Sequence, residues 1–179
     1  MADKERMDYT EYFADVMRIM SSKGLLLATW KDAGTTANAM TIGWGMIGII
    51  WGRPIWQVVV RPSRYTYQLM EREKFFSVNV MPKSLDAALK LCGVASGRDR
   101  DKLTDAKLTA VRGEGVGAPV IRESVIHYEC HVLHANDFIP EAMIPDIRTG
   151  CYPSGDYHRI FWGEIVDCRV DRARVRELP

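Results

Sequence analysis

Short runs of β-branched, aromatic and aliphatic residues, broken by turns that contain glycine or proline, constrain the fold of this chain more than any other feature. The runs have the length and composition of strands, and no regular alternation with long helices separates them. They lie at residues 25–30, 38–44, 46–51, 55–60, 75–80, 125–134 and 159–170. This pattern predicts a mainly β protein with short helices, folded as a closed or partly closed antiparallel barrel.

One amphipathic helix is expected before the first of these strands. Residues 8–20 place aromatic and aliphatic side chains at helical spacing, and Asp8 is suited to cap this helix. Two shorter helices are predicted at residues 65–71 and 84–91, the second with Ser84 as its cap. We expect the first helix to pack on the barrel.

Two long stretches between the predicted strands lack any periodic pattern. Residues 92–118 are rich in Gly, Asp, Arg and Lys, with a helical turn expected near 99–103, and residues 136–158 contain several prolines. Loops of this length are uncommon in a compact domain unless they carry function. We predict one domain over residues 1–179, with residues 1–22 as its N-terminal helical segment.

Composition argues against several classes of protein. The formal net charge of +1 gives no sign of a nucleic-acid tail or a polybasic membrane anchor. The charged N-terminus lacks the apolar stretch of a signal peptide, and the longest apolar run, residues 46–51, is too short to span a bilayer. The four cysteines are irregularly spaced, which favours reduced thiols. We therefore expect a soluble cytoplasmic protein without nucleic-acid or membrane partners.

Two motifs resemble known sites but fail in context. Residues 43–48 match the glycine pattern of a dinucleotide-binding turn, yet a β-branched run follows where that turn needs a helix. His127, Glu129 and His131 share one face of a predicted strand and are residue types that bind zinc or iron. Since no other ligand cluster supports a metal site, we interpret this row as a solvent-facing polar face and predict no metal.

The turn after the fourth predicted strand has the composition of a phosphate site. It holds two guanidinium groups and two hydroxyls just before a predicted helix, in the sequence Arg61-Pro62-Ser63-Arg64-Tyr65-Thr66. Arginine recognises phosphate through paired donors, and free backbone N–H groups at a helix start add to this. Taken alone, the segment could equally be a solvated basic turn.

The neighbouring strands offer the other parts that a flavin mononucleotide, FMN, needs. Asn38, Thr41 and Asn79 are hydrogen-bonding side chains in apolar strands, suited to the polar edge of the flavin ring. Strand capping would also explain each of them. An apolar wall could come from Met40, Trp44, Trp51 and Trp56, although core packing explains most of these residues equally well.

The joint order of these motifs resembles the flavin reductase-like family, whose fold is the FMN-binding split barrel. The order is Asn-x-Met-Thr, Trp, Pro, Arg-Pro-Ser-x-x-Thr and Phe-x-Val-Asn, followed by the run from Cys92 to Lys102 and the closing strand from Tyr157 to Ile165. The likeness extends over roughly residues 20 to 170, and within the family the flavoredoxin type is the most similar.

The resemblance implies a site assembled from several segments. It implies that the flavin and its phosphate are bound by Asn38, Met40, Thr41, Trp44, Arg61, Ser63, Tyr65, Thr66, Asn79, Cys92, Ser96, Gly97 and Arg98. It also implies a homodimer, in which the 136–158 loop can act on the partner's flavin, and a catalytic role for His158 in positioning the nicotinamide of NADH or NADPH.

Three functions follow from these observations. The first is an NAD(P)H:flavin oxidoreductase, in which hydride passes to bound FMN without a side-chain acid or base. The second is a flavoredoxin-type electron carrier, with the same FMN but a protein redox partner. The third is a ligand-binding barrel without redox use.

Overall fold

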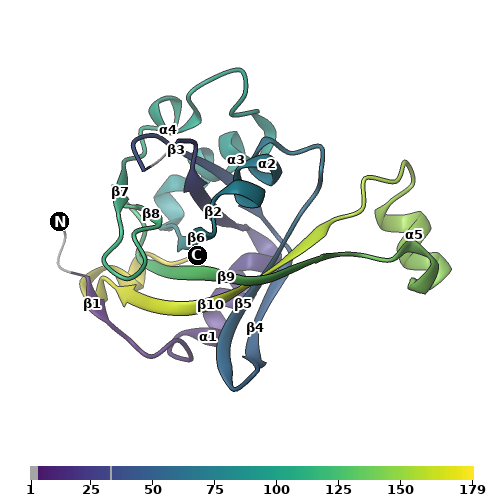
Figure 1. The fold of residues 1–179 in the computed structure, drawn as a ribbon. Coiled ribbons are helices and arrows are strands. Elements are labelled where there is room, and N and C mark those ends of the chain that lie inside the picture. The colour runs from purple at the N-terminus through teal and green to yellow at the C-terminus, as the bar shows by residue number, and fades with distance from the viewer. Residues whose placement is uncertain (1–3, 33) are drawn as a thin grey trace.

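The computed structural model describes residues 4–32 and 34–179 (Figure 1). Its main feature is an eight-stranded antiparallel sheet, in which seven strands follow the order β3-β2-β6-β9-β10-β5-β4 and β1 pairs with β10. The strands are β1 (Glu5–Arg6), β2 (Leu25–Trp30), β3 (Ala37–Ile42), β4 (Gly45–Ile50), β5 (Arg53–Val60), β6 (Phe75–Val80), β9 (Ile126–Asp137) and β10 (Arg159–Val170). A separate hairpin joins β7 (Ala110–Arg112) to β8 (Pro119–Ile121). The predicted mainly β fold is confirmed.

The sheet is curled around a core of large side chains. The consecutive strands β3 and β4 lie at opposite ends of the hydrogen-bonded order. Trp56, Phe76 and Tyr128 are fully buried between the curled walls, and the Trp56 and Tyr128 rings lie 4.6 Å apart. On β10, a Cβ atom at Gly163 would lie 2.5 Å from the Phe76 ring, so only glycine fits this close approach. Burial of these aromatic surfaces supplies much of the driving force for folding.

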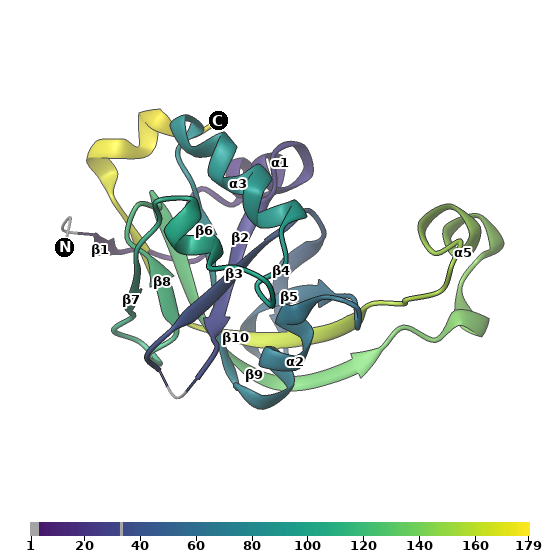
Figure 2. The same ribbon diagram turned by 90° about the horizontal axis from the view of Figure 1, so that it is seen from above.

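Short helices lie on the sheet and its loops, except for the last of them, which lies in a segment that projects from the body (Figure 2). They are α1 (Phe13–Ser22), α2 (Tyr65–Arg72), α3 (Asp86–Val94), α4 (Lys102–Asp105) and α5 (Pro145–Cys151), with 3₁₀ turns at Lys83–Leu85, Pro140–Ala142 and Arg172–Glu177. Within the described residues, no helix is long and apolar enough to cross a membrane.

Two predicted helix caps were wrong. Helix α1 begins at Phe13 because Tyr12, with φ of 60°, has left-handed backbone that no helix can contain. Asp8 instead accepts hydrogen bonds from Thr10 in the turn before it. Ser84 lies within a 3₁₀ turn, and α3 starts at Asp86.

The turn between β4 and β5 is shorter than the gap between the predicted strands at 46–51 and 55–60. Ile50 pairs with Arg53, and Trp51 and Gly52 form the two-residue loop, with φ of 56° and 69°. Positive φ at both positions is the backbone of a type I′ hairpin turn. Trp51 is therefore exposed at the tip of the hairpin and Trp56 lies in the core, so neither belongs to the predicted apolar wall.

The polar row on β9 does not face solvent as predicted. His127 and Glu129 are buried beside Asp167 of β10, and ligand atoms of the three lie within 4.8 Å of one another. The Glu129 carboxylate accepts hydrogen bonds from the backbone N–H groups of Gly115 and Val116, at 2.9 and 3.0 Å. The loop between β7 and β8 thus covers this face. Alternation along a strand predicts which residues share a face but not what covers it.

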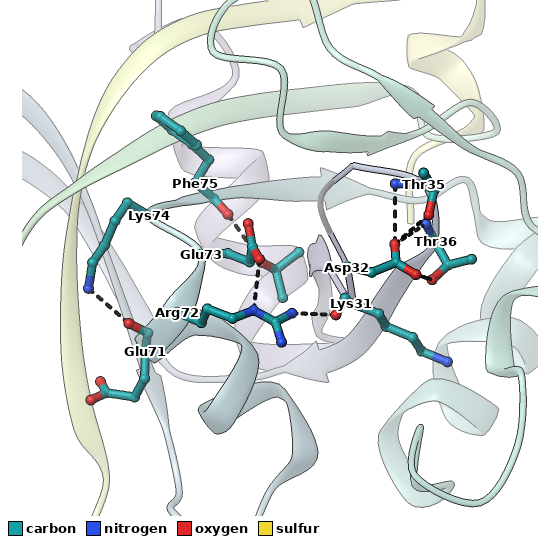
Figure 3. Close-up of polar contacts among 10 residues, drawn as sticks. Lys31, Asp32, Thr35, Thr36, Glu71, Arg72, Glu73, Lys74 and Phe75 are labelled. Atoms are coloured by element: carbon teal, nitrogen blue, oxygen red, sulfur yellow. Dashed lines mark hydrogen bonds and ion pairs between the residues drawn. The ribbon is translucent and has the colours of Figure 1, made fainter.

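Polar contacts join the turn between β2 and β3 to the turn between α2 and β6 (Figure 3). The Asp32 carboxylate accepts hydrogen bonds from the side chains and backbone N–H groups of Thr35 and Thr36. These bonds hold the pKa of Asp32 below its usual value. Arg72 at the end of α2 donates to the Lys31 carbonyl and pairs with Glu73. The two turns therefore support each other at one end of the sheet.

Strands β9 and β10 continue past the curled sheet into a projecting segment, which we call the arm (residues 138–158). The arm contains α5 and extends well to one side of the body (Figures 1 and 2). Its return strand, β10, pairs with β5 from Arg159 to Glu164, so the end of the arm meets the end of β5. The segment predicted as a functional loop is thus anchored beside the Arg61 turn.

Candidate functional site

Two adjoining cavities lie between the end of β5, the start of α2 and the segment after α3. One, which we call the ring-side cavity, has a volume of about 220 Å³, and the other, the phosphate-side cavity, about 120 Å³. Met40 and Arg64 line both cavities, which therefore adjoin at these two side chains. Together they form an elongated hollow that changes in character from one end to the other.

The ring-side cavity combines apolar and cationic walls. It is lined by Met40, Thr41, Ile42, Gly43, Trp44, Val59, Arg61, Arg64 and His158. The Thr41 hydroxyl donates to the Leu89 carbonyl at 2.6 Å, so α3 fixes its orientation. Trp44 lies in the link between β3 and β4 and is 47% exposed, which leaves its ring accessible to a planar ligand.

The phosphate-side cavity is built from the turn into α2 and the segment after α3. Its lining comprises Met40, Ser63, Arg64, Tyr65, Thr66, Cys92, Gly93, Val94, Ala95, Ser96, Gly97, Arg98 and Lys102. Arg98 donates to the Ser63 carbonyl at 3.1 Å and lies over the Tyr65 ring. Lys102 is buried and donates to the Cys92 carbonyl at 3.2 Å. Three cationic side chains therefore converge on a small polar hollow, as an anionic group requires.

Asn38 lies between the start of α2 and the segment after α3. Its Nδ2 donates to the Thr66 hydroxyl at 2.8 Å, whereas its buried Oδ1 has no hydrogen-bond partner within the described residues. A Cβ atom at Gly97 would lie 2.1 Å from this oxygen. Asn38 itself lines neither cavity. Its unpaired acceptor, which is costly when buried, lies beside Thr66 and Gly97 in the wall of the phosphate-side cavity.

Burial shifts the pKa values of the groups that line the phosphate-side cavity. Desolvation lowers the pKa of the Lys102 ammonium. Cys92 raises this pKa, and the neighbouring charges of Lys31 and Arg64 lower it further. Desolvation likewise raises the pKa of Cys92, so its thiol stays protonated at neutral pH. A bound anion would favour the charged form of Lys102.

Arg61 and Ser63 contact the arm. The Arg61 guanidinium donates to the carbonyl oxygens of Cys151 and Asp156, at 2.9 and 3.1 Å. Ser63 donates through its hydroxyl and its backbone N–H to the Asp156 carboxylate. Arg61, which was expected at the phosphate, lines only the ring-side cavity, whereas Arg64 lines both cavities.

The structure does not bring Asn79 to the site. Its side chain is fully buried, donates to the Leu26 carbonyl and the Ser77 hydroxyl, and accepts from the Ile121 backbone N–H. It lines neither cavity. We correct the predicted role of Asn79: its buried side chain links β2, β6 and β8 by hydrogen bonds.

His158 lies at the ring-side cavity, just before β10. Its ring centroid is 5.1 Å from that of Trp44, and its Nδ1 lies 2.8 Å from the hydroxyl oxygen of Tyr152. Burial, reinforced by the charge of Arg61, lowers the pKa of His158 to about 4. The imidazole is therefore neutral at physiological pH.

Sequence analysis missed three residues that the structure places at or beside the site. Arg64 and Lys102 were part of the quoted motifs but were not assigned, and Tyr152 lies in the arm without a motif of its own. A buried lysine is rare unless it is paired, but nothing in the sequence of the charged segment 98–105 indicates that Lys102 is buried.

Comparisons with known proteins show the family of this chain. Residues 17–178 match the flavin reductase like domain family. An uncharacterized protein of Aeropyrum pernix is 30% identical over 150 residues, which cover 78% of this chain and 51% of that protein, so the chain spans about half the length of this relative.

Solved structures show the same fold. The flavoredoxin of Desulfovibrio vulgaris (Miyazaki F) is similar with a TM-score of 0.66 and 25% identity, covering 87% of this chain and 74% of that one. The FMN-binding domain of a flavin reductases-like enzyme from Shewanella baltica has a TM-score of 0.65 and 15% identity, covering 95% and 78%. The chain belongs to the flavin reductase-like family and has the split-barrel fold of its FMN-binding relatives.

Proposed function

We propose that the chain binds FMN in the two adjoining cavities and uses it as an NAD(P)H:flavin oxidoreductase. The observation that carries this proposal is that Met40 and Arg64 line both cavities. The ring-side cavity, which contains Trp44, is therefore continuous in its lining with the cationic phosphate-side cavity. FMN has the matching form, with a planar ring system at one end and a phosphate at the other.

The residues present fit this cofactor. Arg64, Arg98 and Lys102 would hold the phosphate, and Asn38 Oδ1 offers an acceptor for a donor group of the ligand. Met40, Trp44 and Val59 supply apolar surface for the ring. When bound, FMN supplies a ring that accepts a hydride or electrons.

The chain's own groups orient the reactants and limit access of water. The cations Arg61 and Arg64 line the ring-side cavity and would favour negative charge on a group bound there. His158, at the end of the arm, lines this cavity and offers a neutral imidazole for the nicotinamide of NADH or NADPH.

A flavoredoxin-type electron carrier is the second candidate. The 25% identity to a flavoredoxin over 87% of this chain favours it. In that case a redox protein would replace the nicotinamide as partner, whereas a reductase can pass electrons to free flavin. The FMN site would be the same.

We also propose a homodimer. The edge strand β4 and its hairpin expose Met46, Ile49 and Trp51, and the arm exposes Ile139, Ile144 and Ile147. Apolar side chains gathered in this way mark association surfaces. Light scattering after size exclusion should give the mass of a dimer, and a monomer at micromolar concentration would contradict the proposal.

We propose a cytoplasmic location. All four cysteines are free thiols, three of them buried. Free thiols fit a reducing compartment.

Spectroscopy of the purified protein separates the candidate functions. A flavin absorption spectrum, present on purification or after FMN is added, supports a flavoprotein. Bleaching by NADH or NADPH under nitrogen then supports the oxidoreductase. A yellow protein that neither nucleotide bleaches would favour the electron carrier instead, and failure to bind FMN would contradict both.

A further inference from the structure

The His158 imidazole is joined to a buried tyrosine of the arm. The Tyr152 hydroxyl oxygen lies 2.8 Å from Nδ1 of His158, and this hydrogen bond is buried. His158 itself lines the ring-side cavity beside Trp44. One ring nitrogen is therefore engaged by the arm, which leaves Nε2, on the opposite edge of the ring, for a molecule in the cavity.

Two neighbouring side chains pack against the Tyr152 ring. The Arg61 guanidinium carbon lies 4.9 Å from the ring centroid, and the Tyr157 ring centroid lies 4.8 Å away at an interplanar angle of 33°. Tyr152 is 5% exposed and lines a neighbouring apolar cavity of about 310 Å³ but not the ring-side cavity. Its hydroxyl is therefore linked to the ring-side cavity through His158.

The surroundings of His158 keep its imidazole neutral, so that one ring nitrogen can accept a hydrogen bond. Arg61 and Arg64 oppose protonation of the imidazole and Asp156 favours it, and burial is the largest influence. The result is a neutral ring with one N–H. Burial also raises the pKa of the Tyr152 phenol, which keeps its proton. A guanidinium stacked on the phenol ring makes the hydroxyl a better donor.

We propose that Tyr152 is the positioning residue for His158. By donating to Nδ1, its hydroxyl fixes the tautomer that carries the imidazole proton on Nε2. The ring-side cavity thus receives a neutral hydrogen-bond donor suited to a carbonyl or carboxamide oxygen of the second substrate. This substrate class rests on the proposed function, because it assumes that the second substrate enters beside the flavin.

Nitrogen-15 NMR of histidine-labelled protein tests the tautomer without any cofactor. The His158 signals, assigned with His158→Gln, should report an Nε2–H tautomer in the wild-type protein. Tyr152→Phe should give a mixture of tautomers and a higher His158 pKa, because the bond that stabilises the neutral ring is lost. Tyr157→Phe is the matched control, since it removes a hydroxyl from the adjacent ring and leaves the His158 bond intact.

Kinetics test the consequence for the second substrate. With FMN bound, Tyr152→Phe should lower kcat/KM for NADH or NADPH about tenfold, as expected for one misplaced hydrogen bond. FMN affinity should change less than about twofold, and Tyr157→Phe should match the wild-type protein in both respects.

Two results would overturn the positioning role. One is an unchanged His158 tautomer and pKa in Tyr152→Phe, and the other is an unchanged kcat/KM in an active enzyme. If the wild-type protein oxidises neither nucleotide, the proposed oxidoreductase fails, and the NMR result still decides whether Tyr152 sets the tautomer.

Discussion

The Asp156 carboxylate accepts two hydrogen bonds from Ser63, one from the hydroxyl at 2.6 Å and one from the backbone N–H at 3.1 Å. This pair ties the arm to the turn that precedes α2. Asp156 has φ of 58°, a left-handed conformation that is costly for most residues. The contact thus holds the end of the arm against the candidate site.

Replacement of Asp156 should loosen the arm. Asp156→Gly suits the left-handed backbone, so it isolates the loss of the carboxylate. Hydrogen exchange measured by mass spectrometry should become about tenfold faster in residues 145–158, since two hydrogen bonds are lost. Ser63→Ala removes one of the two bonds and should have a smaller effect in the same direction. Unchanged exchange in both variants would show that this contact does not hold the arm.

Substitutions of Arg64 and Asn79 should have different effects, because Arg64 lines the site and Asn79 lies in the core. Arg64→Ala removes a guanidinium from both cavities and should weaken FMN binding at least tenfold while stability changes by less than about 1 kcal/mol. Asn79→Ala leaves the Ile121 N–H without its acceptor and should cost about 1–3 kcal/mol of unfolding free energy.

Urea unfolding and FMN fluorescence titration measure the two effects separately. For Asn79→Ala, the FMN affinity of the folded protein should stay near that of the wild-type protein. The assignment of Asn79 to the core is wrong if this variant unfolds normally but loses FMN.

Gly97 should tolerate no side chain. A Cβ atom there would lie 2.1 Å from Asn38 Oδ1 and 3.0 Å from the Tyr65 ring. Gly97→Ala should therefore displace the loop after α3 and weaken FMN binding at least about tenfold. Gly150→Ala is the control, because nothing lies within 4 Å of the added atom. Equal FMN affinity in the two variants would rule out close packing of this loop on Asn38.

Stability should fall as the pH drops below neutrality, partly because of His127. Burial, with Lys4 and Arg169 nearby, lowers the pKa of His127 to about 3. Between pH 6.5 and that value the unfolded chain binds a proton that the folded chain does not, so unfolding becomes easier as pH decreases. Urea unfolding at pH 7 and pH 5 should show a loss that is smaller in His127→Gln by about 1–2 kcal/mol. An identical loss in both proteins would mean that His127 is protonated in the fold.

Much of the barrel could be predicted from the sequence. The runs Leu25–Trp30, Phe75–Val80 and Arg159–Val170 begin and end where predicted, because dense β-branched and aromatic sequence is bounded there by turn or loop residues. The start of α1 could not be predicted, since apolar spacing continues through the left-handed Tyr12.

The site was harder to predict than the fold. Asn38 and Asn79 look alike in sequence, as single polar residues in apolar strands, yet one adjoins the phosphate-side cavity and the other bonds to Ile121. The difference comes from segments that are distant in the chain, and local patterns carry no information about them. The same limit applies to Tyr152, whose role arises only where the arm meets Arg61.

A paired titration with FMN and riboflavin tests the central claim most directly. The two ligands share the ring system, and only FMN carries the phosphate that Arg64, Arg98 and Lys102 would hold. Fluorescence quenching should show FMN binding at or below micromolar concentration and at least about tenfold more tightly than riboflavin. Equal affinity for both ligands, or no uptake of FMN at micromolar concentration, would contradict the account.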